Sequence, residues 1–109
     1  MTALDRTFAA LADPFGRRAV EILSRGPRPA GEIARELGLA APAMSRRLRA
    51  LRQAGLVEES HPHFDARVRV YALRSGAMSD LKRWLEETEA MWAEQLAALR
   101  THLEKAKKA

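Results

Sequence analysis

Residues 38–57 read GLAAPAMSRRLRALRQAGLV, a pattern typical of a basic amphipathic helix that leads into an extended segment. Pro42 suits the first turn of a helix, where its missing N–H would have no partner in any case. The apolar residues recur at spacings of four and three, which predicts one stripe facing a core. They are Met44, Leu48 and Leu51. Gly55 stands where the end of a helix favours a left-handed residue, so the helix is predicted to end there.

The polar side chains of this predicted helix fall off the apolar stripe and face outward. Arginine reads guanine through two hydrogen bonds and also neutralises phosphate, so this face suits the major groove of DNA. Ser45 and Arg46 are the expected base readers, Arg47 or Arg49 adds a base or phosphate contact, and Arg52 binds phosphate. The residues of this helix predicted to contact DNA are Pro42, Ala43, Ser45, Arg46, Arg47, Arg49 and Arg52.

An arginine-rich helix face is usually just solvated, so the preceding sequence matters. Residues 30–37 are predicted to form a short amphipathic helix with Ile33, Ala34 and Leu37 facing inward, and Gly38 ends it. A helix, a short turn containing glycine and a basic helix together make the layout of a helix-turn-helix.

Two segments, residues 10–23 (ALADPFGRRAVEIL) and residues 38–57, resemble the ArsR/SmtB family of bacterial winged-helix repressors. The resemblance covers nearly the whole chain. It implies a mostly α winged helix-turn-helix with a small β-hairpin, in the order α-α-α-α-β-β-α. It also implies a homodimer, formed through the first and last helices, that represses transcription at a palindromic operator in double-stranded DNA. Ala40 and Ala41 stand where the family usually has Ser and Gln, and Arg47 replaces the usual His, so the operator sequence does not transfer.

The charge distribution of the 109-residue chain, expected to form a single domain, agrees with a local polyanion contact. The net charge is +5, of which residues 43–74 supply +4, residues 1–42 supply +1 and residues 75–109 supply none. A membrane surface would also attract this charge, but the apolar stripe opposite it is needed for the core. No apolar stretch is long enough to cross a bilayer, and residues 1–6 do not resemble a signal peptide. We therefore expect a cytoplasmic protein with no membrane partner.

Neither catalysis nor a cofactor is expected. The sequence has no phosphate-binding glycine loop, no nucleophile elbow and no cysteine, which excludes thiolate metal sites. The other metal site of the family needs Asp and His near the start of the terminal helix, and His and Glu near its end. Here Asp80 has no His two residues on, and His102 is followed three residues later by Lys105. The histidines and aspartate of residues 61–65 are expected to form a solvated turn, so no metal site is predicted.

The first part of the chain predicts two helices and a rigid connector. Residues 3–12 have apolar residues at spacings of four and three, which favours a short amphipathic helix. Asp13 is a good N-cap and Pro14 a good first residue for a second helix, which is expected to end near Ser24. The prolines of residues 26–29 exclude a helix there.

After Gly55 the periodicity changes to that of strands. Residues 56–60 and 67–73 are predicted strands around a tip at residues 61–66, which together make the wing. Arg67 and Arg69 alternate with valines and are placed on the solvent face of the hairpin. They are predicted to contact phosphate or the minor groove, although strand arginines also serve simply to protect an exposed edge.

Residues 75–104 are predicted to form one long amphipathic helix, with residues 104–109 frayed. Such a helix is longer than a compact domain of this size can cover, so its apolar stripe needs a partner, most simply a second copy of itself. The residues predicted to form the dimer interface, together with helix 3–12, are Leu4, Phe8, Leu11, Leu81, Leu85, Thr88, Trp92, Leu96 and Leu99.

Two alternative functions stay open. One is a regulator gated by a small-molecule or protein effector at the dimer interface, where Trp84, Met91 and Trp92 would line a pocket. The other is a winged helix used only for protein contact. The sequence identifies neither an effector nor the regulated genes.

Overall fold

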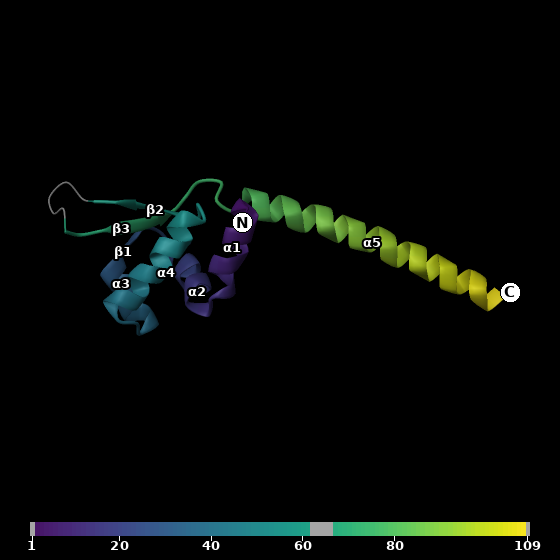
Figure 1. Ribbon diagram of the computed structural model, residues 1–109, viewed down its shortest axis with the longest axis horizontal. Coiled ribbons are helices and arrows are strands. Elements are labelled where there is room, and N and C mark those ends of the chain that lie inside the picture. Colours follow the sequence, from purple (N-terminus) through teal and green to yellow (C-terminus); the bar gives the residue numbers. More distant parts are fainter. Residues whose placement is uncertain (1, 62–66, 109) are drawn as a thin grey trace. The chain divides into compact units, whose positions relative to one another are not determined.

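The computed structural model describes residues 2–61 and 67–108, in two compact units, Met1–Met78 and Ser79–Ala109. The first unit is mostly helical with a small sheet, as predicted (Figure 1). Its elements are α1 (Ala3–Ala12), α2 (Pro14–Leu23), β1 (Arg28–Pro29), α3 (Ala30–Leu37), α4 (Ala41–Gln53), β2 (Val57–Ser60) and β3 (Val70–Leu73). The second unit is a single helix, α5 (Ser79–Lys108). Within the described residues, no helix combines the length and the apolar character that a membrane span requires.

Short polar side chains fix the starts of α1 and α2. The Thr2 hydroxyl accepts a hydrogen bond from the backbone N–H of Asp5, and the Asp5 carboxylate accepts one from that of Thr2. The Thr2 backbone N–H is also the main reason that the pKa of Asp5 is lowered. Asp13 caps α2 by accepting from the N–H of Phe15 at 3.1 Å. The bounds of both helices agree with the prediction from the sequence.

The corner between α1 and α2 depends on a glycine. A Cβ built on the buried Gly16 would lie 2.4 Å from the carbonyl oxygen of Ala10, far inside van der Waals contact with rigid backbone. We therefore expect Gly16→Ala to lower the free energy of unfolding by about 2–3 kcal/mol, measured by urea denaturation. Gly31→Ala is the matched control: its Cβ meets nothing within 4 Å. It is expected to leave stability unchanged or raise it by up to about 1 kcal/mol, because Gly31 is helical. An equal loss in both variants would contradict the steric argument.

The helix-turn-helix is formed by α3 and α4, and the residues predicted to face inward are buried in its core. Gly38 adopts a left-handed conformation (φ +67°) at the end of α3, which lets the N–H of Leu39 bond the carbonyl of Ala34. Gly55 does the same after α4, with φ +78°. The largest fully buried side chains of the first unit are Ile33, Met44, Leu48, Leu51 and Leu56. The apolar stripe of α4 is thus confirmed as part of the core.

The sheet differs from the predicted hairpin in two ways. It has three antiparallel strands in the order β1-β3-β2, because Arg28 and Pro29 pair with Tyr71 and Val70. The predicted order of elements is therefore wrong by one short strand, β1. The strands of the wing are also shorter than predicted: β3 starts at Val70 rather than at residue 67. Residues 62–66, most of the predicted wing tip, lie outside the described residues.

The helix α5 is displaced along the sequence from its predicted bounds of 75–104. Residues 75–78 form a turn in which Gly76 takes φ +71°, so the helix begins only at Ser79. At its other end it continues to Lys108, where Lys105, Lys107 and Lys108 interact favourably with the negative end of the helix dipole. Residues 104–108, which the sequence analysis expects to fray, are therefore part of α5 in the structure.

Candidate nucleic-acid interface

The helix α4 has a buried edge and a basic outer face. Met44, Leu48 and Leu51 are at most 1% exposed, whereas Arg46, Arg49 and Arg52 are exposed. Because the buried edge is fixed in the core, the rotation of the helix about its axis is fixed too, and the three arginines are held on one outer face. Ser45 is half-buried beside them, whereas Pro42 is exposed and Ala43 half-buried in the first turn. No side chain caps the N-terminus of the helix at Ala40, which agrees with the sequence.

Arg47 does not join this outer face. Its Nε lies 2.9 Å from Oδ2 of Asp13, its guanidinium carbon is 5.0 Å from the centre of the Phe15 ring, and it donates to the carbonyl of Ala43. The Nε of Arg47 is buried with no hydrogen-bond partner among the described residues, so its contact with Asp13 is an ion pair without good hydrogen-bond geometry. In the structure Arg47, predicted to add a base or phosphate contact, instead links α4 to Asp13, the residue that caps α2.

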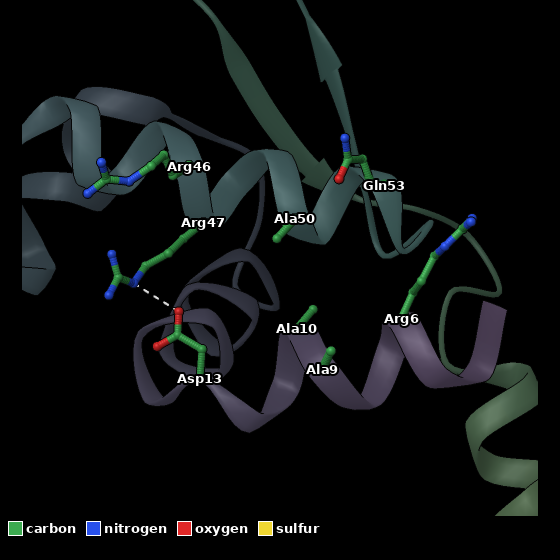
Figure 2. Close-up of a pocket in the computed structure, with 8 residues that line it drawn as sticks. All are labelled: Arg6, Ala9, Ala10, Asp13, Arg46, Arg47, Ala50 and Gln53. Carbon is green, nitrogen blue, oxygen red and sulfur yellow. Dashed lines mark ion pairs between the residues drawn. The ribbon is translucent and has the colours of Figure 1, made fainter. Parts of the chain in front are cut away.

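This link lies at one end of a cleft of about 400 Å³ between α1 and α4. In Figure 2, Arg47 points from α4 to Asp13, whereas Arg6 and Arg46 stand at opposite ends of the cleft. Alanine side chains from both helices line its middle. They are Ala9, Ala10 and Ala50. Small residues here allow the two helices to approach closely, so α1 helps to position α4.

Removing Arg47 tests this structural role. We expect Arg47→Ala to lower the free energy of unfolding by about 1 kcal/mol, since a partly exposed ion pair and a cation–π contact each contribute up to about 1 kcal/mol. Arg46→Ala, one residue earlier on the exposed face, is the matched control and should change stability by less than about 0.5 kcal/mol. Urea denaturation of both variants measures the two free energies of unfolding. Equal stability of the two variants would contradict the role of Arg47 as a link.

A second cleft, the α4–sheet cleft, lies between the outer face of α4 and the strands, with a volume of about 190 Å³. It is lined by Ser45, Arg46, Arg49, Arg52, Glu59, Arg69 and Tyr71. Arg69 donates to the Ser45 hydroxyl at 3.4 Å, which joins the wing to α4. Four arginines around a space large enough for a phosphate group make a strongly positive site.

Glu59 and Tyr71 are residues of this cleft that the sequence did not identify. The Glu59 carboxylate accepts hydrogen bonds from Arg52 at 2.8 Å and from the Tyr71 hydroxyl at 3.1 Å. Burial, followed by the hydrogen bond to Glu59, raises the pKa of Tyr71, so the phenol stays protonated and donates at neutral pH. The two residues face each other in the register of β2 and β3. The contact between Glu59 and Tyr71 could have been predicted only from the register of these two strands, and the sequence alone does not give that register.

The remaining predicted residues are placed as follows. Arg67 and Arg69 are both exposed, but they precede β3 rather than forming part of it. His61 lies 3.4 Å from Glu59, whereas His63 and Asp65, the other possible metal ligands of the wing tip, lie outside the described residues. Within residues 2–61 and 67–108, no three His, Asp or Glu side chains lie close enough together to hold a metal ion.

The predicted dimer residues divide between the two units. On α1, Phe8 is 40% exposed, Leu4 is half-buried, and Leu11 packs on the core of its own unit, which leaves it less surface for a partner. On α5, no residue is buried. Its large exposed apolar side chains are Trp84, Leu85, Met91, Trp92, Leu96, Leu99 and Leu103, and of the other predicted interface residues Leu81 and Thr88 are half-buried.

Comparison with known proteins agrees with this arrangement. Residues 11–60 match the family described as "Helix-turn-helix domain". The HTH-type transcriptional regulator Rv2034 of Mycobacterium tuberculosis is 47% identical over 53 residues, 49% of this chain and 50% of the relative, so the match spans half the length of Rv2034. The transcriptional repressor SdpR of Bacillus subtilis is 27% identical over 82 residues, 75% of this chain and 88% of the relative.

Solved structures extend the likeness over most of the chain. An ArsR-like transcriptional regulator from Rhodococcus sp. RHA1 superimposes with a TM-score of 0.77 at 29% identity, covering 91% of each chain. The homodimeric winged helix-turn-helix domain of Mb0332 from Mycobacterium bovis, a possible ArsR-family regulator, gives a TM-score of 0.61 at 26% identity and covers 86% of this chain and 82% of that one. The chain is therefore similar in sequence and in fold to winged helix-turn-helix transcriptional regulators of the ArsR type.

Proposed function

We propose that this chain binds a palindromic operator in double-stranded DNA as a homodimer and represses transcription by blocking the promoter. The observation that carries the proposal is the outer face of α4, where exposed arginines stand opposite a fully buried apolar stripe. A helix held in this way presents its side chains in a fixed orientation, as reading of base edges requires. SdpR, named as a transcriptional repressor, supports repression over activation.

We assign the contacts by their place on this face. Ser45 and Arg46 lie in the first half of α4, the part that usually enters the major groove, and are assigned to base edges. Arg49 is assigned to a base or a phosphate, and Arg52, near the end of the helix, to phosphate. The backbone and side chains of Pro42 and Ala43 lie in the first turn and are assigned to close approach of the DNA backbone. Arg47 is left out, because it is engaged by Asp13.

The two arginines of the wing, Arg67 and Arg69, are assigned to phosphate or the minor groove. We expect Arg67→Ala to weaken binding to operator and random DNA by similar factors. The slope of log affinity against log salt should become shallower by about 0.9, because one phosphate contact is lost. Fluorescence anisotropy at several salt concentrations measures this slope. An unchanged slope would remove Arg67 from the phosphate contacts.

Dimerisation is proposed through α5 together with Phe8 and Leu4 of α1. The helix α5 is 30 residues long, carries an apolar stripe and has no buried residue. Leu85, Trp92 and Leu96 are each more than 50% exposed. The homodimeric state stated for the Mb0332 domain supports a second copy of this chain as the cover. Two recognition helices related by a two-fold axis would then read half-sites about 34 Å apart.

Selection from a random-sequence duplex library with the purified chain tests this function. We expect enrichment of an inverted repeat whose half-sites are about one helical turn apart. An absence of any enriched sequence would contradict specific DNA binding and favour the protein-contact alternative.

A regulator gated by an effector is the second candidate, and the cleft between α1 and α4 favours it. Arg46, an assigned base reader, also lines this cleft, so a small anion bound there would compete with DNA for the same guanidinium. The cleft is a different place from the predicted pocket at Trp84, Met91 and Trp92, which are all exposed on α5. Displacement of the selected operator by a panel of organic anions, measured at constant ionic strength, tests this candidate. No displacement by any anion would contradict it.

A further inference from the structure

A carboxylate stands inside the most basic part of the proposed DNA interface. Of the seven described residues that line the α4–sheet cleft, four are arginines and only Glu59 is acidic. A negative charge at this place repels the phosphates that the arginines attract, which lowers the affinity for any nucleic acid. Its presence in a DNA-binding face therefore needs a separate explanation.

The contacts of Glu59 link the recognition helix to the sheet. The Glu59 side chain is only 12% exposed. Its Oε2 accepts from Nη1 of Arg52 on α4 and from the hydroxyl of Tyr71 on β3, whereas Oε1 lies 3.4 Å from Nε2 of His61. A carboxylate that is so little hydrated depends on these partners, because a buried charge without them is strongly unfavourable. The same carboxylate thus fixes Arg52 and introduces an acidic group into the cleft.

We propose that Glu59 is a specificity-determining residue that suppresses binding to non-cognate DNA while it positions Arg52 and the sheet for operator binding. The inference rests on the proposed DNA-binding function. Non-cognate binding depends almost entirely on phosphate charge, so it bears the full effect of the repulsion. Operator binding also depends on base contacts from a correctly placed α4. Glu59 positions Arg52, and this offsets part of the operator affinity that is lost through the repulsion.

Glu59→Gln tests the charge, because glutamine has the same shape and still accepts a hydrogen bond from Tyr71. We expect its affinity for random DNA to rise about three- to tenfold, and its salt slope to steepen by about 0.9, because the cleft gains one net positive charge that faces phosphate. Its affinity for the operator should rise less or fall, so the ratio of operator to random-DNA affinity decreases. Fluorescence anisotropy with both duplexes over a series of salt concentrations gives all three quantities.

Glu58→Gln is the matched control, since it removes the same charge from the adjacent residue of β2, which is exposed. We expect it to change the two affinities by equal, small factors. Tyr71→Phe removes the hydroxyl without changing the charge. It should weaken operator binding and leave the salt slope unchanged, whereas a steeper slope would contradict the separation of charge from positioning.

A comparison of Arg52→Gln with the double variant Arg52→Gln/Glu59→Gln covers the case in which Glu59→Gln alone does not fold. Arg52→Gln leaves the charge of Glu59 without its main partner and should lower random-DNA affinity. The neutral pair Arg52→Gln/Glu59→Gln should restore much of that affinity. A double variant that binds random DNA no better than Arg52→Gln overturns the proposal.

The outcomes also separate this inference from the proposed function. If the wild-type chain prefers its selected operator and Glu59→Gln behaves like Glu58→Gln on both duplexes, the role of Glu59 is wrong and DNA binding stands. If the wild-type chain shows no preference among duplexes, both are overturned.

Discussion

A single carboxylate on the apolar stripe of α5, introduced by Trp92→Glu, is expected to dissociate the proposed dimer at micromolar concentration. Trp92 is 65% exposed in the chain alone, so its replacement removes no core packing. In a two-fold symmetric interface the substitution occurs twice, and each carboxylate would be buried without a partner. Sedimentation equilibrium should give a dimer dissociation constant at least about 100-fold higher than that of the wild type.

Loss of the dimer should also remove most of the operator affinity. Two linked recognition helices bind more tightly than one by a factor of about 10²–10⁴, because the second contact is intramolecular. Ala90→Glu is the matched control: it adds the same charge to α5, on the opposite face by helical periodicity. It should remain dimeric and bind the operator as the wild type does. A dimeric Trp92→Glu chain would exclude the stripe of α5 as the interface.

Arg46→Ala is expected to cause the second large effect, a loss of operator affinity of about 5- to 150-fold. This range corresponds to the 1–3 kcal/mol of discrimination that a bidentate arginine–guanine contact contributes. Affinity for random DNA should fall by no more than a few-fold, since only one charge is lost. Anisotropy measurements with the selected operator and a scrambled duplex of equal length give the two values.

The control for Arg46 is Arg18→Ala, which removes an exposed arginine from α2 instead of α4. It should reduce both affinities slightly and equally. Equal losses on operator and scrambled DNA in Arg46→Ala would show that Arg46 contacts phosphate and reads no base.

Local signals determined the helices of the first unit well. The helices α1 and α3 have the predicted bounds of 3–12 and 30–37, because caps and glycine ends mark them in the sequence. The apolar stripe of α4 was predictable for a different reason, since its period fixes which residues are buried. The start of α5 was not predicted, because Gly76 adopts φ +71° in a turn over residues 75–78 and the helix begins only at Ser79.

Features that depend on contacts between distant residues were not predictable from local pattern. The two-residue strand β1 exists only because it pairs with Tyr71 and Val70. The same limit applies to the site. Arg47 looked like another arginine of the recognition face until its contact with Asp13, 34 positions earlier in the sequence, was visible. The role of Glu59 could not be predicted either. The sequence shows two adjacent glutamates in a strand, and the register of β2 and β3 decides which of them faces Tyr71.

The central claim, that two identical subunits present two recognition helices to one duplex, is tested most directly by the stoichiometry of the complex. The selected operator and a duplex carrying only one of its half-sites should each be titrated with the chain, and the mass of each complex determined by sedimentation velocity. The account predicts two chains on the full operator and an affinity for the half-site duplex lower by at least about 10². One chain per duplex, with equal affinity for the two duplexes, would contradict it.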